Sequence, residues 1–122
     1  SFISTSGDLN IWNKVFYSRK LLKRETMKTL ETKQKRTVRN HPIFGITEYG
    51  YGITIDTKEN ILQLGQTGFS PGFVSMSYYF PKTKTSVIVL ENIAYDTNDF
   101  KKTFYYHTEI LKIVREELKN YR

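Results

Sequence analysis

The residues best suited to chemistry gather in one segment, 64–75, where polar side chains and three glycines lie between two strand-like runs. Thr67 offers a hydroxyl, and Gly68 lets the backbone approach a ligand closely. Thr67 and the neighbouring N–H groups could therefore hold an anionic or carbonyl oxygen. The same composition also fits an ordinary Gly/Pro-rich hairpin loop, and local composition alone favours that interpretation.

The other polar residues offer weaker chemistry. His41 precedes a proline in a polar segment, and His107 falls on the apolar face of the last predicted helix, where a packing role is the simpler interpretation. Two histidines give no metal-ligand spacing, and a chain without cysteine has no thiol nucleophile and no Cys-based zinc site. Asp96 and Asp99 could form a carboxylate pair for glycoside chemistry, but such residues before a helix ordinarily cap it. No cofactor and no metal are predicted.

Helices are predicted at both ends of the chain. Ser4, Thr5 or Ser6 can cap a first helix over about 7–17, and a second helix is predicted over about 24–32. A polar, basic connecting loop over 33–42 follows. Near the C-terminus, apolar residues from Phe100 to Leu118 recur at spacings of three and four, which predicts one long helix within 99–120.

Between the helices, glycine, aromatic and β-branched residues predict strands. Runs over 50–55 and 61–66 flank turn residues and form one hairpin, and runs over 73–80 and 85–91 form another. The predicted class is α+β: an antiparallel sheet of about four strands with two short N-terminal helices and a long C-terminal helix packed on the sheet. One domain over 1–122 is expected, made of a basic helical segment (1–40), a strand meander (49–91) and the final helix.

The formal net charge of +7 is carried by residues 1–40, which hold ten Lys or Arg against three Asp or Glu. These cations could bind a polyanion, but they lie between apolar residues at helical spacing, as on the solvated face of a helix, and no nucleic-acid-binding motif accompanies them. Nucleic acid is therefore not an expected partner. The basic residues are Lys14, Arg19, Lys20, Lys23, Arg24, Lys28, Lys33, Lys35, Arg36 and Arg39. No run reaches the length of about 20 apolar residues needed to span a membrane.

Five short motifs in this order resemble the C-terminal part of the β-lactamase-related serine hydrolases, the superfamily of class C β-lactamases, penicillin-binding proteins (DD-peptidases) and related esterases. Ser4 to Leu9 resembles the S-T-x-x-D-L of that family, and Tyr49 to Gly52 its Y-G-x-G strand. Gln66-Thr67-Gly68 lies where the family carries K-T-G or H-x-G. The segments 69–75 and 87–92 resemble the continuations G-x-x-P-G-F-x-S and V-x-V-L-x-N.

The resemblance implies a role for four residues, Gln66, Thr67, Gly68 and Phe69. The backbone N–H of Phe69 would be one oxyanion-hole donor, and Thr67 would help to hold a substrate carboxylate or carbonyl. Gln66 replaces the Lys or His of the family and carries no positive charge, so recognition of an anion is in doubt.

Two catalytic motifs of the family are absent. No serine is followed three residues later by lysine, as the nucleophile motif S-x-x-K requires, and no Y-x-N or S-x-N occurs. In the family these elements lie earlier in the chain. We therefore expect these residues to be a C-terminal piece of a longer protein, unable to catalyse acyl transfer alone.

Two function classes remain open. The longer protein would be a serine hydrolase acting on a small-molecule substrate such as a β-lactam or ester, or on a peptidoglycan-like peptide. The alternative is a non-catalytic binding or structural protein of the same fold, with a basic polyanion-binding module as a less favoured third possibility. If N-terminal strands of the family pair beside 85–91, the exposed sheet edge predicts a homodimer. The resemblance alone suggests the cell envelope, periplasm or extracellular space.

Overall fold

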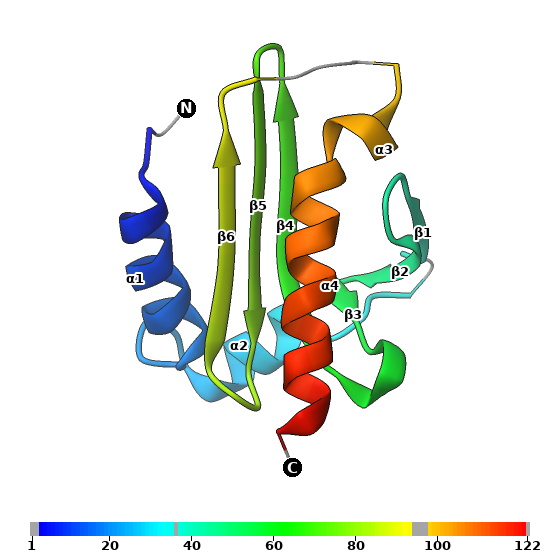
Figure 1. Ribbon diagram of the computed structural model, residues 1–122. Coiled ribbons are helices and arrows are strands. Elements are labelled where there is room, and N and C mark those ends of the chain that lie inside the picture. Colours follow the sequence, from blue (N-terminus) through cyan, green and yellow to red (C-terminus); the bar gives the residue numbers. More distant parts are fainter. Residues whose placement is uncertain (1–2, 36, 94–97, 122) are drawn as a thin grey trace.

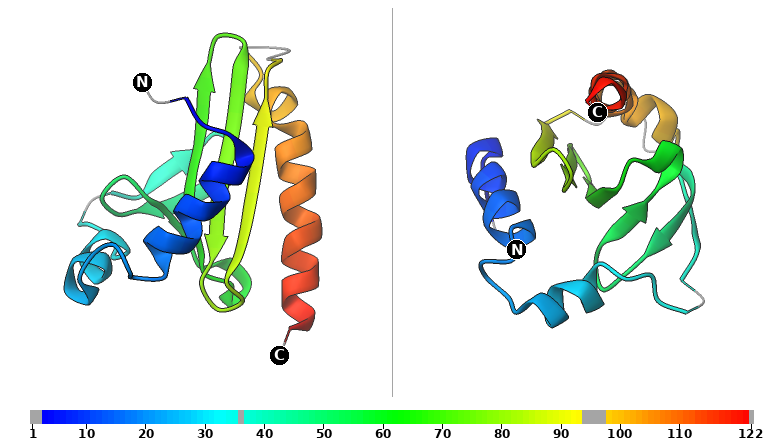
Figure 2. Two further views of the ribbon diagram at one scale, coloured as in Figure 1. Left: turned by 90° about the vertical axis from the view of Figure 1, so that its left-hand side faces the viewer. Right: turned by 90° about the horizontal axis from the view of Figure 1, so that it is seen from below.

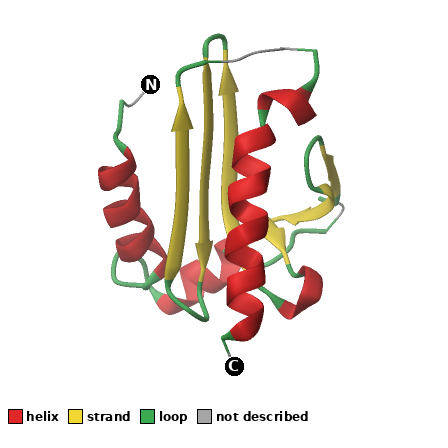
Figure 3. Ribbon diagram, viewed as in Figure 1, coloured by secondary structure: helices red, strands yellow, loops and turns green. Residues whose placement is uncertain are grey.

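A six-stranded antiparallel sheet, with the strands in sequence order from β1 to β6, forms the centre of the chain. The computed structural model describes residues 3–35, 37–93 and 98–121. The three long strands β4 to β6 run side by side, and the short strands lie off to one side (Figure 1, Figure 3). The strands are β1 (Arg39–His41), β2 (Gly45–Tyr49), β3 (Thr54–Asp56), β4 (Gln63–Ser70), β5 (Phe73–Phe80) and β6 (Thr85–Glu91). The α+β class is confirmed, with six strands instead of about four.

The helices begin where capping residues allow. In α1 (Ser6–Tyr17) the Thr5 hydroxyl accepts a hydrogen bond from the Asp8 N–H at 3.1 Å, and α2 (Arg24–Leu30) follows. The Asp99 carboxylate accepts from the N–H groups of the next turn and caps α3 (Phe100–Thr103). The predicted single C-terminal helix is interrupted at Phe104, where ψ is 21°, and α4 (Tyr105–Asn120) continues from there. A short 3-10 turn, η1 (Lys58–Asn60), precedes β4.

Three parts of the predicted strand pattern were wrong. The segment 33–42, expected as a loop, contains β1, whose three polar residues carry no alternating apolar signal. Of the expected strand over 50–55, only Thr54 and Ile55 are strand, in β3, and residues 50–53 form the connection from β2, which ends at Tyr49. The expected loop after residue 66 is strand: β4 continues to Ser70, and only Pro71 and Gly72, with φ of 82° at the glycine, make the turn.

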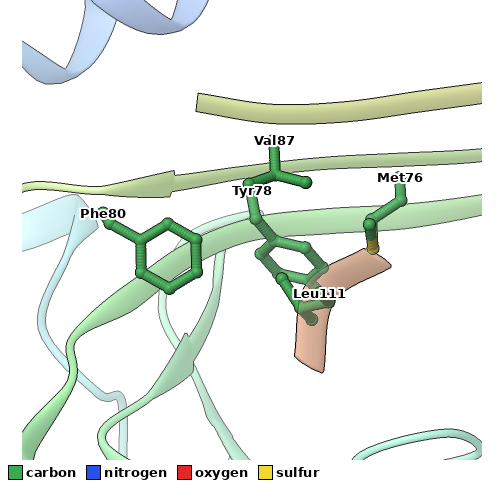
Figure 4. Packing of buried hydrophobic residues seen from close by; sticks show 5 residues of the cluster. All are labelled: Met76, Tyr78, Phe80, Val87 and Leu111. Atoms are coloured by element: carbon green, nitrogen blue, oxygen red, sulfur yellow. The ribbon is translucent and has the colours of Figure 1, made fainter. Parts of the chain in front are cut away.

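Helices cover the two faces of the long strands, and each face has its own core. On one face, every second side chain of β5 packs toward Leu111 of α4. These side chains are Met76, Tyr78 and Phe80, and Val87 of β6 lies beside them (Figure 4). The intervening Tyr79 stacks on Tyr17 of α1, with ring centroids 4.9 Å apart. Because successive side chains of a strand point to opposite faces, α1 and α4 lie on opposite faces of β5. Figure 2 shows the two helices flanking these strands.

A second core joins the short strands to the N-terminal helices. Its buried members are Ile53, Ile55 and Leu64, and the partly buried Phe16 of α1 and Leu30 of α2 pack against them. This core fixes β3 and the start of β4 relative to α1. The predicted site residues follow this buried start of β4, on the second half of the strand.

Candidate functional site

The second half of β4 has an unpaired edge within the described part of the chain. β3 pairs with β4 only from Asp56↔Gln63 to Thr54↔Gly65, whereas β5 pairs with β4 as far as Ser70. Side-chain exposure also rises along the strand, from buried at Gln63 to exposed at Phe69. The four predicted site residues, Gln66 to Phe69, thus lie where the strand leaves the core and one edge becomes free.

The hairpin turn sets which backbone groups reach that edge. Ser70 and Phe73 flank a two-residue turn, and the residues that flank such a turn hydrogen-bond to each other. Bonded and non-bonded pairs alternate along an antiparallel ladder. The N–H groups of Phe69 and Thr67 are therefore directed away from β5, toward the unpaired edge. A ligand oxygen at this edge would meet backbone donors.

The Thr67 hydroxyl is held by a histidine that the sequence did not single out for this role. His41 Nε2 lies 3.0 Å from Thr67 Oγ1. His41 Nδ1 accepts hydrogen bonds from the N–H groups of Ile43, at 3.2 Å, and Phe44, at 3.4 Å. The ring proton must therefore reside on Nε2, which donates to Thr67. The Thr67 O–H remains free to donate to a ligand.

The charge state of His41 agrees with this assignment. Partial burial, together with the nearby Lys58 ammonium, lowers the pKa of His41. The neutral ring is thereby favoured, and only the neutral ring can accept at Nδ1. The signal available in the sequence was the His-Pro turn between β1 and β2, but nothing in it predicts a contact with a residue 26 positions away.

Gln66 points to the opposite face of β4, toward α1, and its amide is fully engaged within the chain. Its Oε1 accepts from the Thr54 hydroxyl at 3.2 Å, and its Nε2 donates to the Gly52 carbonyl at 3.1 Å. The same nitrogen also donates to the Tyr49 hydroxyl. Gln66 therefore ties β4 to the β2–β3 connection.

Phe69 completes the end of the strand on the α4 face. Its ring meets Phe100 of α3 edge to face, with centroids 5.4 Å apart, and Phe100 in turn lies near Phe104. These contacts fix the end of β4 against the C-terminal helices. Gly68 pairs with Ser75, whose hydroxyl would lie 2.5 Å from a Cβ at position 68. The site thus has Thr67 and Phe69 on one face and Gln66 and Gly68 on the other.

The weaker candidates stay apart from this strand. His107 is buried, packs against the Phe104 ring, and has Nδ1 3.6 Å from Glu91 Oε2, so it holds a core position as expected. Asp96 lies outside the described residues, and Asp99 is the cap of α3. Among the residues described, no group of three or more His, Asp or Glu side chains could hold a metal ion.

The basic residues of the N-terminal segment lie mainly on the surface. All of those described are exposed, and Arg36 lies outside the described residues. Arg19 pairs with Glu31 at 3.2 Å and Lys33 with Glu48 at 2.6 Å. These charges form the solvated side of the helices and the following segment. Within the described part of the chain, no helix has the length and apolar character needed to cross a bilayer.

Comparison with known proteins gives structural neighbours only. No protein-family model and no curated protein matches the chain. The fold is similar to part of the octameric penicillin-binding protein homologue from Pyrococcus abyssi, with a TM-score of 0.65 and 27% identity over 89% of this chain. It is also similar to part of a D-stereospecific amidohydrolase from Streptomyces sp., with a TM-score of 0.61 and 19% identity over 83% of this chain.

The matched regions are 24% and 30% of those two solved chains, so this chain spans less than a third of their length. Both neighbours agree with the resemblance stated from the sequence motifs. The similarity to the penicillin-binding-protein and β-lactamase group of serine hydrolases is therefore confirmed at the level of the fold.

Proposed function

We propose that this chain forms one wall of the acyl-transfer site of a longer serine hydrolase acting on a β-lactam, a peptidoglycan peptide or an ester. The observation that carries the proposal is the unpaired edge of β4, to which the Phe69 N–H is directed. Such a donor would stabilise the negative charge that develops on a carbonyl oxygen during acyl transfer. The free O–H of Thr67 would bind a second oxygen of the substrate.

The reaction needs groups that these residues do not supply. The nucleophilic serine and the lysine that activates it would come from elsewhere in the longer protein, because S-x-x-K is absent here. The fraction of each neighbour that the chain matches, under a third, supports this arrangement. The role proposed for the present chain is to position the substrate carbonyl and to stabilise the oxyanion.

Covalent labelling tests the proposal. The longer protein that contains this chain would be incubated with a fluorophosphonate or a fluorescent β-lactam, beside the 122-residue chain alone, and examined by intact mass. We expect label on the longer protein only. A longer protein that is folded but unlabelled by either reagent would refute acyl transfer.

Variants of Thr67 make the test specific for β4. Thr67→Val removes the hydroxyl with little change in shape, and we expect the labelling rate to fall about tenfold, the effect of one lost hydrogen bond. Thr29→Val, on an exposed position of α2, is the matched control and should leave the rate unchanged. Equal rates for both variants would contradict the role of Thr67.

His41 is proposed as a positioning residue for Thr67, and two substitutions separate its two hydrogen-bonding functions. His41→Asn keeps an acceptor for the N–H groups of Ile43 and Phe44 but does not reach Thr67. His41→Gln keeps a donor that reaches Thr67 but loses that acceptor. We expect the asparagine variant to lower the labelling rate more than stability, and the glutamine variant to do the reverse. If both variants lose labelling rate and stability to the same extent, His41 has a structural role alone.

A second candidate function is a non-catalytic binding protein of the same fold. It is favoured by one observation, the neutral and fully hydrogen-bonded Gln66 at the position where the family carries Lys or His. Under this alternative the longer protein would bind a ligand at the β4 edge without becoming labelled. Reversion by Gln66→Lys would then be the first substitution to examine for a gain of labelling.

A further inference from the structure

A cavity of ≈ 330 Å³ lies between α1 and the sheet, on the face of β4 to which Gln66 points. Residues from α1, from the β2–β3 connection and from two neighbouring strands surround it. The lining residues are Leu9, Trp12, Asn13, Phe16, Tyr17, Tyr51, Gly52, Ile53, Gly65, Gln66 and Ser77. The cavity is therefore built by segments that are far apart in the sequence.

None of the described residues that line the cavity is charged. Aliphatic and aromatic side chains make most of its wall, and Trp12 and Tyr51, 50% and 58% exposed, are its most solvent-accessible aromatic residues. Polar groups on its wall include Asn13, which is buried, and Ser77. Asn13 Nδ2 donates to Ser77 Oγ at 3.0 Å. The wall thus offers neutral hydrogen-bonding groups and no counterion.

Gln66 adds no free hydrogen-bond donor to this uncharged wall. Both hydrogens of its amide nitrogen are used, one by the Gly52 carbonyl and one by the Tyr49 hydroxyl. Its oxygen is used by the Thr54 hydroxyl. A carboxylate entering the cavity would lose part of its hydration and find no cation and no free Gln66 donor, which is unfavourable.

We infer that this cavity binds a neutral, apolar group of the ligand, such as an aromatic acyl side chain, and excludes a carboxylate. The inference rests on the proposed function, because it names the class of substrate for the site at β4. An apolar group would gain free energy by leaving water for the aromatic wall. Neutral esters or amides are therefore the substrate class, in place of ligands recognised by an anionic group.

Trp12 provides a direct test, because it is the single tryptophan of the chain and lines the cavity. The 122-residue chain would be titrated with N-phenylacetylglycinamide and with the free acid N-phenylacetylglycine, and the Trp12 emission followed. We expect the amide to change the emission and to bind at least about tenfold more tightly than the acid, since each factor of ten is 1.4 kcal/mol. Equal or tighter binding of the acid, or an emission that neither compound changes, would overturn the inference.

Adding a cation should reverse the preference. Tyr51→Arg places a guanidinium at a solvent-exposed position without disturbing a buried contact, and Gln66→Lys places an ammonium inside the cavity. We expect both variants to raise the affinity for the free acid by about tenfold or more, while Tyr51→Gln should not. If a folded Tyr51→Arg variant binds the free acid no more tightly than the parent chain, the lack of a cation is not the reason for the preference for the amide.

The outcome can be separated from that of the proposed function. The titration measures binding by the chain alone and requires no nucleophile, whereas covalent labelling requires the longer protein. Labelling of the longer protein without selective binding by the chain would support acyl transfer and refute the neutral substrate class. Selective binding without labelling would keep the cavity and favour the non-catalytic candidate.

Discussion

Replacement of Gly65 by alanine should disrupt the sheet at the base of the candidate site. Gly65 has φ of 149°, and a Cβ at this position would lie 2.1 Å from the Ser77 carbonyl oxygen and 2.9 Å from the Tyr78 Cα. Both contacts are to backbone, so relief requires β4 and β5 to separate. The backbone strain is worth about 1–3 kcal/mol and the overpacking about 1–3 kcal/mol, which together predict a loss of about 2–6 kcal/mol.

Gly72→Ala is the matched control. Gly72 also has positive φ, 82°, but a Cβ there would have no heavy atom within 4 Å. Only the backbone term applies, so we expect a loss of about 1–2 kcal/mol. The comparison isolates the close approach of β4 to β5 from the conformational preference of glycine.

Urea denaturation of the two variants and the parent chain, followed by far-UV circular dichroism, gives the free energies of unfolding. Unchanged slopes with denaturant would show that the unfolded states are comparable. Equal losses for Gly65→Ala and Gly72→Ala would refute the reasoning, because the contacts with β5 would then carry no cost. A Gly65→Ala variant that does not fold at all would agree with the upper end of the expected range.

Three further predictions concern the rest of the fold. Arg115→Ala removes the Nη1 donor that lies 2.9 Å from Oε1 of the buried Gln63. We expect urea denaturation to show a free energy of unfolding lower by about 1–3 kcal/mol, because a buried acceptor loses its partner. Lys112→Ala, at an exposed position of the same helix, should change this free energy little. Burial lowers the pKa of His107 from its ordinary 6.5, so the unfolded chain binds more protons than the folded chain. The free energy of unfolding should therefore fall as the pH drops below about 6.5, and it should fall less steeply in His107→Gln. No described strand pairs with the outer edge of β6, so this edge should associate with a second copy of the chain. Light scattering should show less dimer for Leu90→Lys, which adds a charge at an exposed position of β6, and a clean monomer at all concentrations of the parent chain would contradict this.

The strands and helices with strong local patterns could be predicted from the sequence. The bounds predicted for β5 and β6, 73–80 and 85–91, are those observed, because apolar runs flank four turn-forming residues. The apolar spacing of α4 likewise predicted its buried face. The interruption at Phe104 was missed, since helical periodicity continues across it.

The short strands could not be predicted in the same way. β1 has three residues, all polar, and it is a strand only because β2 pairs with it at Arg39↔Thr47 and the two following positions. The second half of β4 carries glycine and polar residues typical of a loop, yet β5 holds it in the sheet through Ser70. In both cases the hydrogen bonds of a neighbouring strand override a weak local preference.

The sequence by itself determined which groups the candidate site can contain: the Thr67 hydroxyl, a neutral amide at Gln66, and no serine with its lysine. The tertiary structure decided how those groups are used. It placed His41 on Thr67, bound Gln66 to Thr54, and formed a solvent-accessible cavity whose described lining, which includes Asn13 and Ser77, carries no charge. Residue types are fixed by the chain alone, whereas the partner of each polar group depends on which distant segments folding brings together.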